Sequence, residues 1–159
     1  MKRTQDRAVQ YQLQMDEAGI LLAAARILEG RLQRQGRIHS PEQAGSYLIA
    51  RCAHLSHEIF GVVFLDNQHH ILATEHLFTG TTDACEVHSR VVAKRALELN
   101  AVALILFHNH PSDNPEPSEA DRRVTKRLQE ALGLLDIRVL DHLVIGGQKS
   151  VSLAARGWA

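Results

Sequence analysis

The chain has 159 residues, 45% of them hydrophobic and 23% charged, which suits one folded domain and excludes global disorder. Its 18 basic and 18 acidic residues give no net charge, and aromatic residues make up only 4%. Neither bulk electrostatic attraction to nucleic acid nor a stacking platform for single-stranded bases is therefore expected.

Residues 1–36 are predicted to form a helical extension in front of a main domain at 37–159. Leu21, Ala25, Leu28 and Leu32 recur at helical spacing, and Gly36 is expected to end this amphipathic helix. Two roles stay open at this point. The helix docks on the main domain, or it forms a homodimer or binds another partner.

The main domain mixes helical and strand patterns. Ser40 can cap a helix that starts at Pro41, with Gln43 completing a capping box. Helices are predicted at about 40–54, at 88–99 and from residue 118 onward. Strands are predicted at 58–65, 71–78, 101–107, 137–140, 143–145 and near residue 151. The first and third strands are apolar on both faces, so we expect an α/β or α+β domain with a mixed sheet covered by helices on both sides.

Ten histidines are unusual in a chain of this length, and His108 and His110 stand where a buried strand ends. Residues two apart in a strand point to the same side, so both imidazoles can bind one metal ion. Asp121 is the candidate third ligand, because it lies one helical turn before an apolar stripe of Val124, Leu128, Leu132 and Leu135. Two histidines and one carboxylate leave a position for water, as in catalytic zinc sites.

The complete pattern, His-x-His followed by seven residues and Ser-x-x-Asp, resembles the JAMM motif of the MPN/JAB metalloprotease superfamily. Within that superfamily the chain resembles the RadC family over Gly36 to Trp158. It is similar to short forms found in prophages and mobile elements, which lack the complete N-terminal helix-hairpin-helix region. The segments that carry this resemblance are His108–Ser112, Glu116–Asp121, Val87–Arg90, Arg95–Ala101 and Ile137–His142. Asp113 departs from the family pattern, since many relatives have glycine at this position. The departure bears on the shape of the loop over the site and not on metal ligation.

The resemblance implies a largely antiparallel central sheet of the MPN/JAMM (cytidine deaminase-like) fold. It implies one Zn²⁺ per chain with His108, His110 and Asp121 as ligands, Glu58 as the residue that transfers protons, and Ser118 as a hydroxyl that steadies the oxyanion. The implied function is a zinc-dependent, metallopeptidase-like hydrolase that cleaves a peptide or isopeptide bond of a protein or peptide substrate with a zinc-activated water.

Alternatives remain for individual residues. Glu58 can be a solvated strand end, with Glu75 and Glu86 as rival bases, and Ser118 can serve only as a helix cap. The histidine His88 is close to the site in the family pattern, without an assigned role.

Alternatives remain for the function as well. The main rival is a non-catalytic or DNA-repair-associated scaffold, although DNA binding by this chain alone is not expected. A metal-dependent nuclease and a cysteine protease built on Cys85 and His88 are further alternatives.

Cys52 and Cys85 are too few for a disulfide framework. With no recognisable signal peptide and no apolar run long enough to span a bilayer, we expect a cytoplasmic protein.

Overall fold

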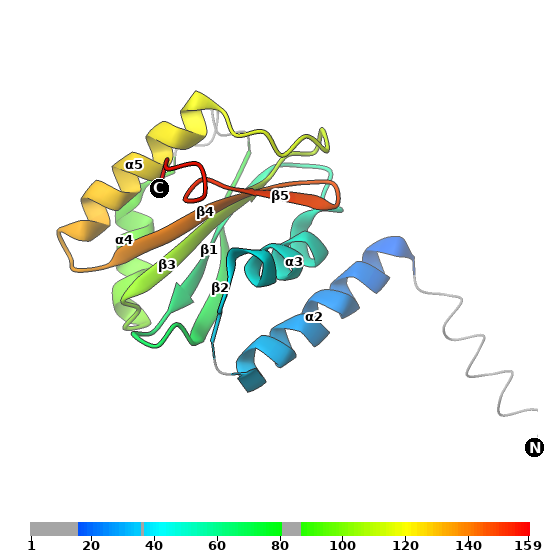
Figure 1. The fold of residues 1–159 in the computed structure, drawn as a ribbon, viewed down its shortest axis with the longest axis horizontal. Helices are drawn as coiled ribbons and strands as arrows, with labels where there is room; N and C mark the ends of the chain where they lie inside the picture. The colour runs from blue at the N-terminus through cyan, green and yellow to red at the C-terminus, as the bar shows by residue number, and fades with distance from the viewer. Residues whose placement is uncertain (1–15, 36, 81–86) are drawn as a thin grey trace, which may run out of the picture.

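The computed structural model describes residues 16–35, 37–80 and 87–159, and a mixed sheet lies between two layers of helices (Figure 1). The strands are β1 (Ile59–Leu65), β2 (Ile71–Thr79), β3 (Ala103–Asn109), β4 (Arg138–Gly146) and β5 (Lys149–Ser152). The helices are α2 (Glu17–Gln35), α3 (Pro41–Cys52), α4 (Ser89–Glu98) and α5 (Glu119–Gly133). The predicted α+β class with a mixed sheet is confirmed.

The strands lie in the order β2-β1-β3-β4-β5. Among the described strands only β3 and β4 are parallel neighbours, so the sheet is largely antiparallel. A parallel pair needs a crossover connection, and α5 provides it. The sequence predicted two short strands where the structure has a continuous β4. Asp141 and His142 interrupt the apolar pattern there, yet both are buried and have hydrogen-bond partners inside the fold.

Two separate cores hold the sheet, because side chains alternate between its faces. On one face, Val63 of β1 and Ile105 of β3 pack with Tyr47 of α3. On the other face, Leu106 of β3 packs with Leu128 of α5, and α4 completes this layer. Every residue of β1 and β3 is buried, as expected for a sheet covered on both sides.

The N-terminal helix α2 packs against α3, where Ala25 is fully buried and Leu28 touches the core. Its other side is open, with Ile20 54% and Ile27 57% exposed. Gly36, which was expected to end this helix, lies outside the described residues, as does the side chain of Leu32. No helix among the described residues is long and apolar enough to cross a bilayer.

Ser40 caps α3 as predicted, since its hydroxyl oxygen accepts the Gln43 N–H at 3.2 Å. The Gln43 side chain, however, accepts the backbone N–H of His39 at 3.0 Å. The reciprocal bond of the capping box therefore falls one residue earlier than the sequence suggested.

Candidate metal centre

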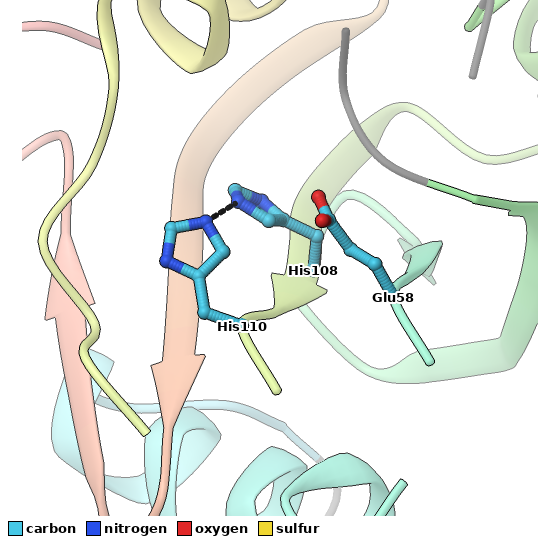
Figure 2. Close-up of side chains that lie close together, drawn as sticks. All are labelled: Glu58, His108 and His110. Carbon is cyan, nitrogen blue, oxygen red and sulfur yellow. Dashed lines mark hydrogen bonds between the residues drawn. The ribbon is translucent and has the colours of Figure 1, made fainter. Parts of the chain in front are cut away.

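The site lies where β3 ends beside the start of β1, on the sheet face that α5 covers (Figures 1 and 2). His108 is the second-last residue of β3 and pairs with Phe60 of β1. His110 follows β3 directly, and Glu58 directly precedes β1, which begins one residue later than predicted. His108 is fully buried, whereas Glu58 and His110 are partly exposed. Antiparallel pairing of β1 with β3 thus brings residues about fifty positions apart to one end of the sheet.

Side chains converge closely at this point. The Nε2 atoms of His108 and His110 are 2.9 Å apart. Asp121 Oδ1 lies 3.2 Å from His108 Nε2, and Asp121 Oδ2 lies 3.8 Å from His110 Nε2. A nitrogen or carboxylate oxygen from each of Glu58, His108 and His110 falls within 4.8 Å of the others, and Figure 2 shows the Glu58 carboxylate beside the His108 ring.

Asp121 is positioned by the N-terminus of α5. Ser118 is the N-cap, and a complete capping box joins the two residues. The Ser118 N–H donates to Asp121 Oδ2 at 2.7 Å, and the Asp121 N–H donates to Ser118 Oγ at 3.2 Å. Burial raises the pKa of Asp121, but the neighbouring His108 and the Ser118 groups lower it by more, so the pKa lies below its ordinary range. The helix N-terminus also favours a negative charge there.

The surroundings of Asp121 and His110 fit a bound metal ion. Asp121 Oδ1 is buried and has no hydrogen-bond partner, which is costly for a carboxylate oxygen. His110 Nδ1 lies 2.8 Å from the Asn114 carbonyl oxygen, and a carbonyl can only accept, so Nδ1 carries the proton. Nε2 of a neutral His110 therefore has a lone pair directed at the cluster. Imidazole nitrogens and a carboxylate oxygen are suitable ligands for zinc.

The buried stripe of α5, which faces the sheet, differs in part from the predicted one. Asp121 is buried, as expected, and Leu128 and Leu132 follow it in the core. The remaining buried position is Thr125 rather than Val124, which is only partly buried. Leu135 lies beyond the end of α5 and is 42% exposed. The buried positions of α5 are thus spaced by four, three and four residues, a regular helical stripe that is rotated slightly from the predicted one.

Glu58 is held through its own backbone by Asn109, the middle residue of the His-x-His segment. Asn109 Oδ1 accepts the Ile59 N–H at 2.8 Å, and Asn109 Nδ2 donates to the His57 carbonyl at 3.0 Å. One buried side chain thus bridges the peptide groups on either side of Glu58. Sequence reasoning missed this role, because only the strand pairing brings Asn109 to residue 58.

The acids and thiols that the sequence offers as alternative catalytic groups either lie in surroundings different from those of Glu58 or fall outside the described residues. Glu75 of β2 binds Arg95 of α4 through two oxygens, at 2.6 and 2.8 Å, and this contact lowers the pKa of Glu75. Burial raises the pKa of the Cys52 thiol to about 12, so this thiol stays protonated. Glu86 and Cys85 lie outside the described residues. His88 is exposed at the N-terminus of α4, with its ring 6.4 Å from that of Phe78.

The loop that covers one side of the site has a constrained shape. Asp113 adopts a φ of 62°, a left-handed conformation that glycine takes without strain and that aspartate tolerates better than most residues. A Cβ atom on Gly146 at the end of β4 would lie 2.6 Å from the Asn114 carbonyl carbon. The loop therefore packs tightly on β4, which fixes the carbonyl that His110 contacts.

Comparison with known proteins points to one family. Residues 38–158 match the family model described as "RadC-like JAB domain". A protein of Vibrio cholerae named UPF0758 protein is 53% identical over 142 residues, which cover 89% of each chain. A UPF0758 protein of Xanthomonas oryzae pv. oryzae is 52% identical over 141 residues, covering 89% of this chain and 63% of the relative. The chain therefore spans less than two thirds of the Xanthomonas relative.

Proposed function

The chain belongs to the RadC-like JAB domain family, and from this premise we propose that it is a zinc-dependent hydrolase of an amide bond, peptide or isopeptide, in a protein or peptide substrate. The observation that carries this proposal is the convergence of His108, His110 and Asp121, with a buried carboxylate oxygen that has no hydrogen-bond partner. We assign these residues as the ligands of one Zn²⁺ per chain.

Zinc held at this place would act as a Lewis acid and bring the pKa of a bound water toward neutrality. The protein's contribution is to fix the ligands before binding. Ser118 N–H holds Asp121, and the Asn114 carbonyl holds His110. Three protein ligands leave one position for water or substrate, which is the arrangement of catalytic zinc sites.

Glu58 is the residue that we assign to proton transfer. Its carboxylate lies within reach of the histidine pair but at the partly exposed side of the site, where substrate and water can enter. There it takes a proton from the attacking water and later gives a proton to the leaving nitrogen. The backbone bridge from Asn109 limits the movement of Glu58 during both transfers.

Ser118 is assigned to the oxyanion. Its hydroxyl oxygen accepts the Asp121 N–H in the helix cap, so the hydroxyl hydrogen can be donated to the oxygen of a carbonyl under attack. This residue is exposed and adjacent to Asp121, which gives a substrate carbonyl access to it.

Glu58→Gln is the variant that tests the proposed chemistry. Glutamine keeps the shape of the side chain but cannot accept a proton, so zinc content should remain while turnover falls by about a hundredfold or more. The measurement is cleavage of a panel of peptide and isopeptide substrates by zinc-loaded protein, with elemental analysis of each sample.

Glu75→Gln is the matched control. Glu75 belongs to the same sheet, and its carboxylate forms an ion pair with Arg95. It should keep both zinc and activity. Full activity of Glu58→Gln would contradict our assignment of Glu58. A wild-type chain that binds zinc but cleaves no member of the panel would favour the scaffold function.

A further inference from the structure

A chain of buried hydrogen bonds runs beneath the site, from α5 through β4 to β3. Its members are Thr125, His142 and His108, each with no exposed surface. Thr125 Oγ1 lies 2.7 Å from the Asp121 backbone carbonyl oxygen and 2.6 Å from His142 Nδ1. His142 Nε2 lies 2.8 Å from His108 Nδ1. The chain therefore ends at the ring whose other nitrogen faces Asp121 and His110.

The number of available protons determines which group donates and which accepts in each of these hydrogen bonds. The Asp121 carbonyl oxygen can only accept, so it takes the single hydroxyl hydrogen of Thr125. The Thr125 oxygen must then accept from His142, which places the His142 proton on Nδ1. A neutral imidazole has one N–H, so His142 Nε2 is an acceptor. The His142 ring has no exposed surface, and its two nitrogens lie against the Thr125 hydroxyl and the His108 imidazole rather than against a carboxylate, which is the setting of a neutral imidazole.

The same count determines the state of His108. His142 Nε2 accepts, so His108 Nδ1 must carry the proton and donate it. Nε2 of a neutral His108 is then without a proton and points at the cluster, 3.2 Å from Asp121 Oδ1. The opposite direction would place a proton on His108 Nε2, where it would compete with a metal ion.

Aromatic packing fixes the planes of both rings. The Phe60 ring is stacked with His108, with centroids 6.4 Å apart and planes 11° apart. The same Phe60 ring meets His142 edge to face, with centroids 5.5 Å apart. Rotation of either imidazole would break these contacts in a packed core, so ring orientation and proton position are set together.

We propose that Thr125 and His142 are positioning residues that keep the His108 proton on Nδ1 and present Nε2 for coordination. This inference rests on the proposed function, because it assigns His108 as a zinc ligand. Metal-binding histidines commonly donate their second N–H to a fixed acceptor, and loss of such an acceptor typically weakens metal binding about 10- to 100-fold. Here the acceptor is a neutral histidine whose own tautomer is fixed by a threonine.

Thr125→Val and Thr125→Ser form the test pair. Valine has the shape of threonine without the hydroxyl, whereas serine keeps the hydroxyl. Zinc affinity, measured by competition with a chromophoric chelator, should fall about 10- to 100-fold in Thr125→Val and stay within a few-fold of wild type in Thr125→Ser. Thermal unfolding of the metal-free proteins shows whether each variant is folded. Equal affinity of folded Thr125→Val and wild type would overturn the proposal.

A second measurement needs no variant. Long-range ¹H–¹⁵N NMR spectra of the histidine rings in the wild-type chain report which nitrogen carries each proton. We expect His142 and His108 to be protonated on Nδ1, with and without zinc. Protonation of His142 on Nε2 would overturn the proposal. If the wild-type chain bound no zinc, the proposed function would fail, whereas these spectra of the metal-free chain would still decide the direction of the hydrogen-bond chain.

Discussion

Two carboxylates approach the histidine pair, and their surroundings differ. Asp121 is fully buried and fixed by the N-cap of α5, with one oxygen that has no hydrogen-bond partner. Glu58 is partly exposed and lies just before β1. A metal ligand benefits from a fixed, ionised carboxylate, whereas a group that exchanges protons with water needs access to solvent. This contrast supports our assignment of Asp121 as ligand and Glu58 as the proton-transferring residue.

Ser118→Gly separates the two roles of Ser118. Glycine is a tolerable N-cap and costs only a few tenths of a kcal/mol relative to serine, so α5 and zinc content should be nearly unchanged. If the hydroxyl stabilises the oxyanion, turnover should fall by about 10²- to 10³-fold. The measurement is turnover on a cleaved substrate together with thermal unfolding. Turnover within about twofold of wild type would leave Ser118 as a helix cap only.

At the scale of elements, the sequence predicted what local spacing determines. The His-x-His pair at a strand end and the Ser118–Asp121 cap are local, and the structure brings them together. The supporting residues are not local. The His108–His142 contact joins residues 34 apart, and the Asn109–Ile59 contact joins residues 50 apart. Strand order and register decide these contacts, and no periodicity in one segment contains that information.

Asn109→Ala tests how β3 supports β1 at the site. Removal of the side chain leaves the His57 carbonyl and the buried Ile59 N–H without their partner, so the free energy of unfolding should fall by about 1–3 kcal/mol. Turnover should fall as well, because the backbone of Glu58 is less constrained, whereas zinc affinity should change little. Denaturant unfolding, zinc titration and kinetics measure the three effects.

Asn109→Asp is the comparison for this variant. It keeps an acceptor for the Ile59 N–H and loses the donor to the His57 carbonyl. The new carboxylate oxygen would face that carbonyl, acceptor against acceptor in a buried position, so we expect losses of stability and turnover at least as large as in Asn109→Ala. A zinc affinity that falls as steeply as turnover in Asn109→Ala would show that Asn109 supports the ligands and not Glu58.

At the scale of the whole molecule, α2 and the site lie on different faces of the sheet (Figure 1). Ala25 faces α3, and the exposed Ile20 and Ile27 are seven residues apart, on one side of α2. The homodimer through the N-terminal helix stays a prediction. In such a dimer we expect this apolar side of α2 to contact the partner subunit.

Ile20→Lys combined with Ile27→Lys tests this prediction. Light scattering should show a dimer for wild type and a monomer for the double variant, with zinc content unchanged in both. Leu97→Lys on α4 is the control, because Leu97 is similarly exposed, at 54%, on the other face. A monomeric wild-type chain at high concentration would rule out the dimer.

The most direct test of the account is zinc stoichiometry in wild type and Asp121→Asn. Asparagine still accepts the Ser118 N–H in the helix cap, so the variant should fold, but its neutral amide is a poor zinc ligand. Each protein is stripped of metal, dialysed against buffered zinc and analysed for zinc per chain. We predict about one zinc per wild-type chain and far less in the folded variant. No zinc in wild type, or equal zinc in both proteins, would contradict the central claim.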